Sequence, residues 1–220
     1  IERIHRIPGL ERIRLGSLEP RIITEEFAGA LAGLAKFCPH FHLSLQSGCD
    51  ATLKRMNRHY TTEDYLRRCG ILRKWFDHPA ITTDVIVGFP GETQEEFEIT
   101  REFLKKVHFY EMHVFKYSKR AGTRAAVMPD QVPEQVKGRR SDVLLELEAS
   151  MSREYREHFI GSSVWVLFED MAEVEGRKYI IGHTPQYVKA ALAVKDGEEN
   201  RLSGQILCLK AAGLLGGDLL

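Results

Sequence analysis

Residues 81–93 read Ile-Thr-Thr-Asp-Val-Ile-Val-Gly-Phe-Pro-Gly-Glu-Thr, and this stretch decides the fold. Its first nine residues form a nearly continuous apolar run, which is typical of a parallel strand buried on both faces. Pro90 and Gly91 then end the strand, and Thr93 with Glu96 three residues later predicts the capped start of a helix. A buried strand that turns directly into a helix indicates the α/β class.

The same alternation of strand and helix extends to both sides of this stretch. Strands with alternating polar and apolar residues are predicted at 12–15, 41–46 and 112–117. Helices are predicted to begin after Thr24 and Thr61, which are N-cap candidates followed by acidic residues. Four strands with three intervening helices predict a parallel sheet with right-handed crossovers.

The pattern changes in the last third of the chain. A long charged helix is predicted at about 133–160, and short strands separated by turn-rich acidic loops follow it. Their spacing predicts a small, closed or partly open β-barrel. We therefore divide the chain into residues 1–132, a linking helix at 133–160, and a small all-β part at 161–220. The predicted short strands lie at 164–168, 179–182, 187–194 and 205–210.

Composition and charge exclude some classes of function. The 220 residues carry 31 Lys and Arg against 31 Asp and Glu. Residues 1–140 hold 23 basic against 18 acidic side chains, whereas residues 141–220 hold 8 against 13. The first part is compatible with nucleic acid, and the acidic second part disfavours strong nonspecific RNA binding there. No apolar run approaches roughly 18 residues and no secretory signal is visible, so we expect a cytoplasmic protein without a membrane span.

The cysteines do not form a recognisable ligand motif. Cys38, Cys49, Cys69 and Cys208 are separated by 10, 19 and 138 residues, which matches no zinc, redox or cluster spacing. We interpret them as free thiols in a reducing compartment.

Strand alternation places polar side chains inside the predicted sheet. If Phe41, Leu43 and Leu45 pack outward against helices, then the residues between them point inward. The same parity argument applies to the other three strands. A bound polar ligand would explain a polar interior, and mutual pairing of these groups is the alternative. The residues predicted to point inward are Arg12, Arg14, Gly16, His42, Ser44, Gln46, Thr82, Asp84 and Ile86, and His113, Phe115 and Tyr117 share one face.

The carboxyl ends of the strands are the expected location of a ligand site. Residues 46–48, 88–92 and 117–118 all lie at such ends. A basic stretch follows the last strand and is a candidate for phosphate contacts. It contains Lys116, Lys119, Arg120 and Arg124.

Four of these stretches, taken in order, resemble one family. Residues 12–20, 45–48, 83–93 and 113–123 together resemble the radical-SAM methylthiotransferases, and the match covers nearly the whole chain. The first and last of them look most like the branch that acts on threonylcarbamoyladenosine in tRNA.

The resemblance implies a fold: the C-terminal part of a radical-SAM partial (βα)6 barrel, holding its third to sixth strands, followed by a small all-β TRAM (OB-like) RNA-binding barrel. It also implies methylthiolation at C2 of N6-threonylcarbamoyladenosine next to the anticodon, with S-adenosylmethionine and [4Fe–4S] clusters as cofactors and tRNA as partner. The cluster ligands would lie outside this chain, since a cluster needs thiolates. We therefore interpret the chain as a fragment that is inactive alone.

The resemblance and the parity argument together suggest binding residues, without a catalytic residue or metal ligand. Glu92 is interpreted as a charge at a helix N-terminus. Open alternatives are a methylthiotransferase for isopentenyladenosine or a ribosomal protein, and an RNA-binding module without a cluster. Cofactor-binding candidates are Ser44, Gln46, Ser47, Asp84, Ile86, Gly88 and Phe115, and substrate-binding candidates are Arg14, Ser17, Tyr117, Lys119, Arg120 and Arg124.

Overall fold

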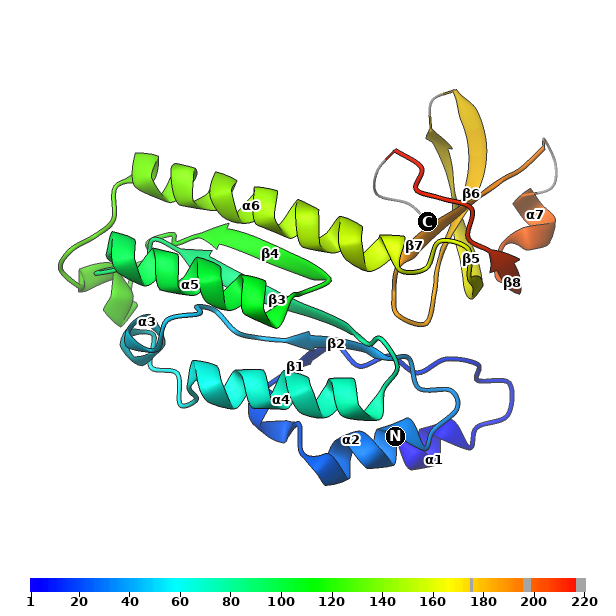
Figure 1. Ribbon diagram of the computed structural model, residues 1–220, viewed down its shortest axis with the longest axis horizontal. Helices are drawn as coiled ribbons and strands as arrows, with labels where there is room; N and C mark the ends of the chain where they lie inside the picture. The colour runs from blue at the N-terminus through cyan, green and yellow to red at the C-terminus, as the bar shows by residue number, and fades with distance from the viewer. Residues whose placement is uncertain (175, 196–198, 217–220) are drawn as a thin grey trace. The chain divides into compact units, whose positions relative to one another are not determined.

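The computed structural model describes residues 1–174, 176–195 and 199–216 (Figure 1). The chain divides into two compact units, and each contains its own sheet. The parallel-sheet unit comprises Leu15–Ala35 and Phe41–Met151. The antiparallel-sheet unit comprises Ile1–Arg14, Lys36–His40 and Ser152–Leu220.

The parallel sheet has four strands in the order β1-β2-β3-β4. Its strands are β1 (Ser17–Leu18), β2 (His40–Leu43), β3 (Ala80–Val87) and β4 (Glu111–Lys116). Its helices are α2 (Glu25–Ala32), α3 (Asp50–Arg55), α4 (Thr62–Trp75) and α5 (Gln94–Val107), with a 3-10 turn η1 at Pro20–Ile22. The register of β3 on β4 is parallel from Thr82–Glu111 to Val87–Lys116. This arrangement confirms the predicted α/β class.

The predicted helix starts are confirmed by their caps. The hydroxyls of Thr24, Thr61 and Thr93 each accept a hydrogen bond from a backbone N–H three residues later. At Thr61 and Thr93 the acidic side chain at the third position also accepts from the capping residue's N–H, which completes a capping box. Two donors are thus satisfied at each of these helix ends.

The two faces of the parallel sheet differ in burial, as strand parity predicts. Phe41 and Leu43 on β2 and Val85 on β3 are fully buried. The ring of Phe41 packs 5.0 Å from that of Phe76, which follows α4. Of the alternate residues, His42, Asp84 and Ile86 are only partly buried, whereas Thr82 is buried. One face is therefore the core, and the opposite face presents polar side chains.

The strand predicted at 12–15 is wrong in position. Only Ile13 forms an isolated bridge, to Phe37, and the paired strand is β1 at Ser17–Leu18. Arg12 belongs to the antiparallel-sheet unit, where its guanidinium donates to the backbone carbonyls of His183 (2.7 Å) and Trp165 (3.0 Å). These bonds hold the segment outside the parallel sheet. The prediction that Arg12 and Arg14 point into the interior of that sheet is therefore wrong.

The antiparallel-sheet unit holds four strands in the order β7-β6-β5-β8. They are β5 (Ser163–Val174), β6 (Arg177–His183), β7 (Lys189–Ala193) and β8 (Ile206–Lys210), and the short helices are α1 (Glu2–His5) and α7 (Glu199–Leu202). In the ladders formed by the described residues, β7 and β8 are the edges, so the sheet is open. These four strands therefore do not form the fully closed version of the predicted barrel.

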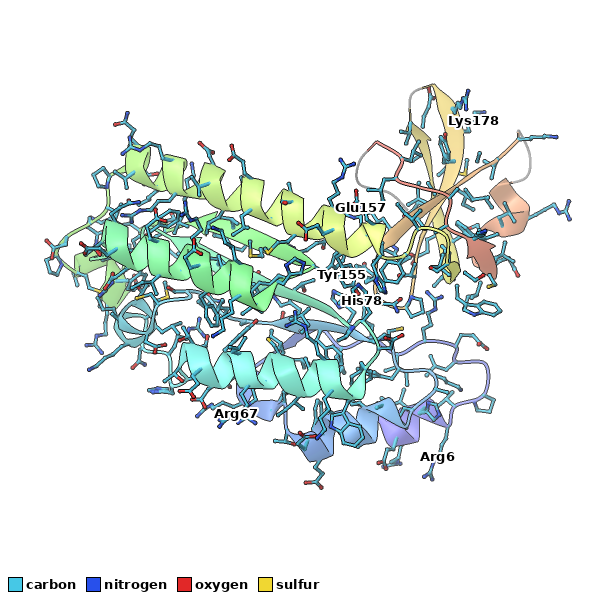
Figure 2. The ribbon with its side chains drawn as sticks, viewed as in Figure 1. Arg6, Arg67, His78, Tyr155, Glu157 and Lys178 are labelled. Carbon is cyan, nitrogen blue, oxygen red and sulfur yellow. The ribbon has the colours of Figure 1, made fainter. Side chains whose placement is uncertain are left out.

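A 24-residue helix, α6 (Glu134–Glu157), passes from one unit into the other along the chain. Near its end lies Tyr155, which is labelled in Figure 2, and its ring packs edge-on against that of Phe159 at 5.5 Å. The division between the units falls after Met151, earlier than the boundary that we expect at residue 160. The division into 1–132, 133–160 and 161–220 stays a prediction. No helix among the described residues is both long and apolar enough to cross a membrane.

Candidate functional site

A cavity of about 530 Å³ lies at the carboxyl ends of β3 and β4 and beneath the loop after β4. Its volume is within the range of small-molecule sites, roughly 300–1,000 Å³. The apolar part of its lining is Ile86, Phe89, Phe115, Tyr117 and Ala125. The polar part is Gln46, Asp84, Lys116, Ser118, Arg120 and Thr123.

The structure brings many of the predicted site residues to this cavity. Gln46, Asp84, Ile86 and Phe115 from the cofactor set, and Tyr117 and Arg120 from the substrate set, all line it. Five lining residues were not individual candidates, namely Phe89, Lys116, Ser118, Thr123 and Ala125, although Phe89 and Ser118 belong to the stretches expected at the strand ends and Lys116 to the basic stretch. Strand parity cannot place these five, because all but Lys116 lie outside the strands and Lys116 is the last residue of β4.

Gln46 owes its position to the backbone. Its N–H donates to the Asp84 carbonyl (2.8 Å), and its own carbonyl accepts from the Ile86 N–H (2.9 Å), so it bridges to β3 beyond the end of β2. Its φ of 72° lies in the left-handed region, which a non-glycine residue seldom adopts. A strained backbone conformation of this kind persists only where the surrounding structure enforces it, and such residues cluster at binding sites.

Three predicted site residues lie elsewhere in the parallel-sheet unit. The Ser47 hydroxyl is buried, shares a hydrogen bond with that of Thr100 on α5 (3.2 Å) and accepts from the Cys49 N–H. Ser44 is half-buried, and its carbonyl accepts from the Tyr60 hydroxyl. Ser17 is exposed on β1. None of the three is among the lining residues of the cavity.

The turn after β3 is held by a buried ion pair. The Glu92 carboxylate accepts from the Gly88 N–H (2.6 Å) and from Arg140 Nη1 of α6 (2.6 Å). Burial raises the pKa of Glu92, and the bonds from Gly88 and Arg140 oppose that rise. Our interpretation of Glu92 as a helix N-terminal charge is therefore wrong. It is an internal counterion that connects the turn to α6.

Lys137 of α6 completes this attachment. Its Nζ donates to the Tyr117 carbonyl (2.9 Å) and pairs with Glu134, while its aliphatic stem packs on Gly88. Tyr117 in turn packs edge-on against Phe89 at 5.3 Å. The two aromatic walls of the cavity are thus positioned by a helix that the sequence-based site did not include.

Gly88→Ala is expected to destabilise the chain by about 2–5 kcal/mol. Gly88 has φ +72°, and a Cβ there would lie 2.3 Å from Lys137 Cγ. A left-handed alanine costs roughly 1–2 kcal/mol and overpacking roughly 1–3 kcal/mol. Gly122 (φ +80°, no atom within 4 Å of the added Cβ) is the matched control, and Gly122→Ala should show only the first cost. Denaturant unfolding of both variants tests this, and equal losses would contradict the steric argument.

Arg14 is engaged within the antiparallel-sheet unit. Its guanidinium lies 3.9 Å from the ring centre of Tyr187, which also stacks on His183 at 4.3 Å. Arg14 and Tyr187 remain exposed to solvent. The predicted contact of Arg14 with substrate stays a prediction.

The basic loop after β4 is exposed. Arg120 lines the cavity described above, and Lys119 lines a neighbouring hollow of about 540 Å³ together with Lys116 and Lys137. Arg124 is exposed at the start of the 3-10 turn η2 (Arg124–Val127). The loop therefore presents several cations at the open side of the cavity.

The four cysteines of this chain do not fit an iron–sulfur cluster. Cys38, Cys49 and Cys69 are buried, and burial raises the pKa of Cys69 to about 12 and also raises that of Cys38. Among the described residues, no three cysteines lie close enough together to hold one metal. A cluster needs thiolates, so we derive no step through a cluster held by these residues.

Comparison with known proteins identifies the class that this fold and cavity define. Residues 1–104 match the Radical SAM superfamily. An Escherichia coli structure, described as that of coproporphyrinogen III oxidase, a radical SAM enzyme, superposes with a TM-score of 0.51 at 21% identity over 64% of this chain and 32% of its own. The structural likeness supports the fold alone. Residues 1–104 therefore carry the match to a radical SAM domain.

Its sequence relatives are tRNA methylthiotransferases. The threonylcarbamoyladenosine tRNA methylthiotransferase MtaB of Bacillus subtilis is 41% identical over 93% of this chain and 45% of its own length. The tRNA-2-methylthio-N(6)-dimethylallyladenosine synthase of Acetivibrio thermocellus is 42% identical over 80% of this chain and 37% of its own. The chain thus spans less than half the length of these relatives.

Proposed function

We propose that this chain forms the part of a tRNA methylthiotransferase that binds S-adenosylmethionine and the target nucleoside, and that the nucleoside is N6-threonylcarbamoyladenosine beside the anticodon. The observation that carries this proposal is the cavity at the carboxyl ends of β3 and β4, which combines apolar walls with two cations, Lys116 and Arg120. S-adenosylmethionine would supply radical and methyl-transfer chemistry, and the iron–sulfur ligands would come from outside these four cysteines.

The cofactor side of the proposal rests on the inner part of the cavity. Ile86 and Phe115 offer apolar surface that suits an adenine ring, and Gln46 and Asp84 offer polar groups that suit a ribose or an amino group. Phe115 is 53% exposed, although it is a large apolar side chain. A ligand that covered this ring would remove that apolar surface from water.

The substrate side of the proposal rests on charge. Threonylcarbamoyladenosine carries a carboxylate, whereas dimethylallyladenosine carries an uncharged hydrocarbon in the corresponding position. Lys116 and Arg120 both line the cavity, and an arginine can bind a carboxylate through two parallel hydrogen bonds. These cations favour the anionic nucleoside.

A second candidate substrate is dimethylallyladenosine. Several relatives are named as synthases of the 2-methylthio derivative of this nucleoside, and the aromatic pair Phe89 and Tyr117 could contact a hydrocarbon. The two candidates make opposite predictions for the effect of the cavity cations. Removal of charge should weaken binding of the anionic nucleoside selectively and should leave binding of the hydrocarbon unchanged or improved.

The test is fluorescence anisotropy with anticodon stem-loop RNAs that differ only in the modified nucleoside. We expect this chain to bind the threonylcarbamoyladenosine RNA about tenfold more tightly than the dimethylallyladenosine RNA, and Lys116→Met/Arg120→Met to remove most of that preference, because a charged hydrogen bond contributes roughly 1.5–3 kcal/mol.

Lys119→Met is the matched control, since Lys119 belongs to the same loop but does not line this cavity. It should lower affinity for both RNAs equally. Tighter binding of the dimethylallyladenosine RNA by the unmodified chain would support the second candidate. A preference that survives in the double variant would show that other residues read the carboxylate.

A further inference from the structure

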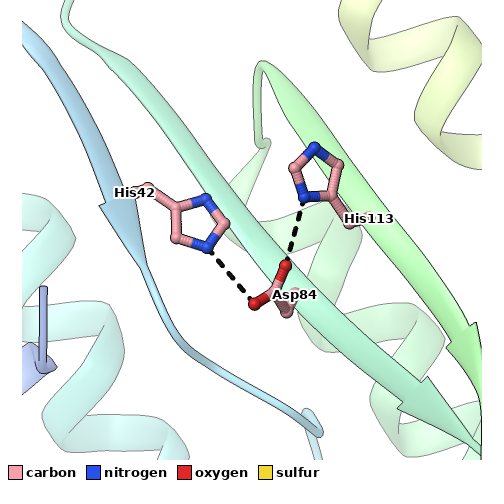
Figure 3. A group of neighbouring side chains, drawn as sticks. All are labelled: His42, Asp84 and His113. Atoms are coloured by element: carbon pink, nitrogen blue, oxygen red, sulfur yellow. Dashed lines mark hydrogen bonds and ion pairs between the residues drawn. The ribbon is translucent and has the colours of Figure 1, made fainter. Parts of the chain in front are cut away.

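Three side chains converge on the polar face of the parallel sheet. His42, Asp84 and His113 come from the neighbouring strands β2, β3 and β4, and the carboxylate of Asp84 lies between the two imidazoles (Figure 3). Asp84 Oδ2 lies 3.3 Å from His42 Nε2, and Asp84 Oδ1 lies 3.2 Å from His113 Nδ1. The imidazoles also stack, with ring centres 5.7 Å apart.

One ring is oriented by a buried neighbour. The Nδ1 atom of His42 is hydrogen-bonded to the Thr82 hydroxyl at 2.9 Å, and Thr82 is 3% exposed. This contact directs the other nitrogen, Nε2, toward Asp84. Histidines that bind metals are usually held in this way through their second nitrogen.

The spacing of the donor atoms matches a coordination polyhedron. One nitrogen or oxygen from each residue can be chosen so that all three atoms lie within 4.8 Å of one another. In a tetrahedral zinc site with bonds of about 2.0–2.1 Å, neighbouring ligand atoms are about 3.3 Å apart. The His42–Asp84 and His113–Asp84 separations of 3.3 and 3.2 Å are close to this value, but they end on different oxygens of the carboxylate, so binding one ion would need a small adjustment of the side chains. His113 has the most room for such an adjustment, since its side chain is 60% exposed, against 12% for His42 and 28% for Asp84.

We propose that His42, Asp84 and His113 form a site for one divalent first-row transition metal ion. Two imidazole nitrogens with one carboxylate oxygen suit such ions, zinc and iron(II) among them. Asp84 also lines the cavity, so a remaining coordination position would be open to water or to an oxygen of a bound ligand. The site uses no cysteine. It does not rest on the proposed function.

The alternative is that the two histidines serve only as hydrogen-bond partners of Asp84. The observed distances between Asp84 and the two histidines are compatible with hydrogen bonds as well as with a metal site, so metal binding itself must be measured. The experiment titrates zinc chloride into this chain, without a histidine tag and with the exposed Cys208 replaced by Ser, in an isothermal calorimeter. We expect one equivalent of zinc to bind and the thermal unfolding temperature to rise with zinc.

The variants separate a specific site from surface binding. Asp84→Asn and His113→Ala should each weaken zinc binding at least tenfold, and Thr82→Ala should weaken it by about 10-fold through loss of the orienting contact. His59 is an exposed histidine in the loop between α3 and α4, so His59→Ala is the control and should bind zinc unchanged. Cobalt(II) provides a second readout, because its visible spectrum should show nitrogen and oxygen coordination in the unmodified chain.

The proposal would be overturned if the unmodified chain bound zinc and cobalt no more tightly than the Asp84→Asn variant does. Equal binding by His113→Ala would also overturn it. If a variant loses its circular dichroism spectrum, the comparison of unfolding temperatures decides the question: zinc should raise that of the unmodified chain, and the same zinc concentration should raise that of Thr82→Ala by less. Neither readout uses RNA or S-adenosylmethionine, so this result is independent of the proposed function.

Discussion

Replacing Arg140 with Met should destabilise this chain by about 3–5 kcal/mol, the cost of leaving a buried charge without its partner. Arg140 and Glu92 are almost inaccessible, with side chains 6% and 1% exposed. Arg140 also donates to the Glu92 backbone carbonyl and lies over the ring of Phe97. The free energy of unfolding at pH 7, measured in denaturant, tests this expectation.

The matched control is the double variant Arg140→Met/Glu92→Gln. The glutamine oxygen can still accept from the Gly88 N–H, and no buried charge remains, so much of the lost stability should return. If the double variant is as unstable as Arg140→Met alone, then the packing of Arg140 and not its charge stabilises the turn.

Acid should reduce the loss in Arg140→Met. Burial raises the pKa of Glu92 in the folded chain above its value of 4.5 in model compounds, and removal of Arg140 takes away a group that opposes this rise. A carboxyl whose pKa is raised on folding binds its proton more tightly in the folded state, so its destabilising effect is complete above the folded pKa and disappears as pH falls toward 4.5. The stability difference between the single and double variants should therefore shrink on acidification from pH 7.

The second large effect concerns tRNA binding. Charge removal at Lys119, Arg120 and Arg124 together should lower the log–log salt slope of tRNA binding by about 2–3, because each phosphate contact contributes roughly 0.7–0.9. All three side chains are exposed and lie in or next to the loop beside the cavity. The measurement is a tRNA titration at several salt concentrations.

Two further triple variants locate the phosphate contacts. The control is charge removal at Arg67 (labelled in Figure 2), Lys74 and Lys105, which should change the slope little. All three are exposed and are paired with acidic side chains on or beside α4 and α5. Charge removal at Arg177, Lys178 and Lys189 tests β6 and β7. If this last variant loses the slope and the loop variant keeps it, the phosphates are bound by the antiparallel sheet and our placement is wrong.

Several features of the fold follow from the sequence because they depend on neighbouring residues. The helix starts at Thr24, Thr61 and Thr93 need only a hydroxyl and an N–H three residues away. The buried strand at β3 needs only a run of apolar residues that ends at a turn. Strand alternation likewise places Asp84 on the polar face, because successive side chains in a strand point to opposite faces.

Other features depend on groups that are far apart in the sequence, so only the tertiary structure decides them. Glu92 meets Arg140 across 48 residues, and a local pattern predicts a helix-terminal charge where the fold builds a buried ion pair. His42 and His113 meet only because β2 and β4 lie on either side of Asp84. The segment at 12–15 alternates like a strand, yet the bonds of Arg12 to His183 and Trp165 hold it elsewhere. The periodicity of a segment indicates which secondary structure the segment favours locally. Tertiary packing decides which distant partner the segment pairs with.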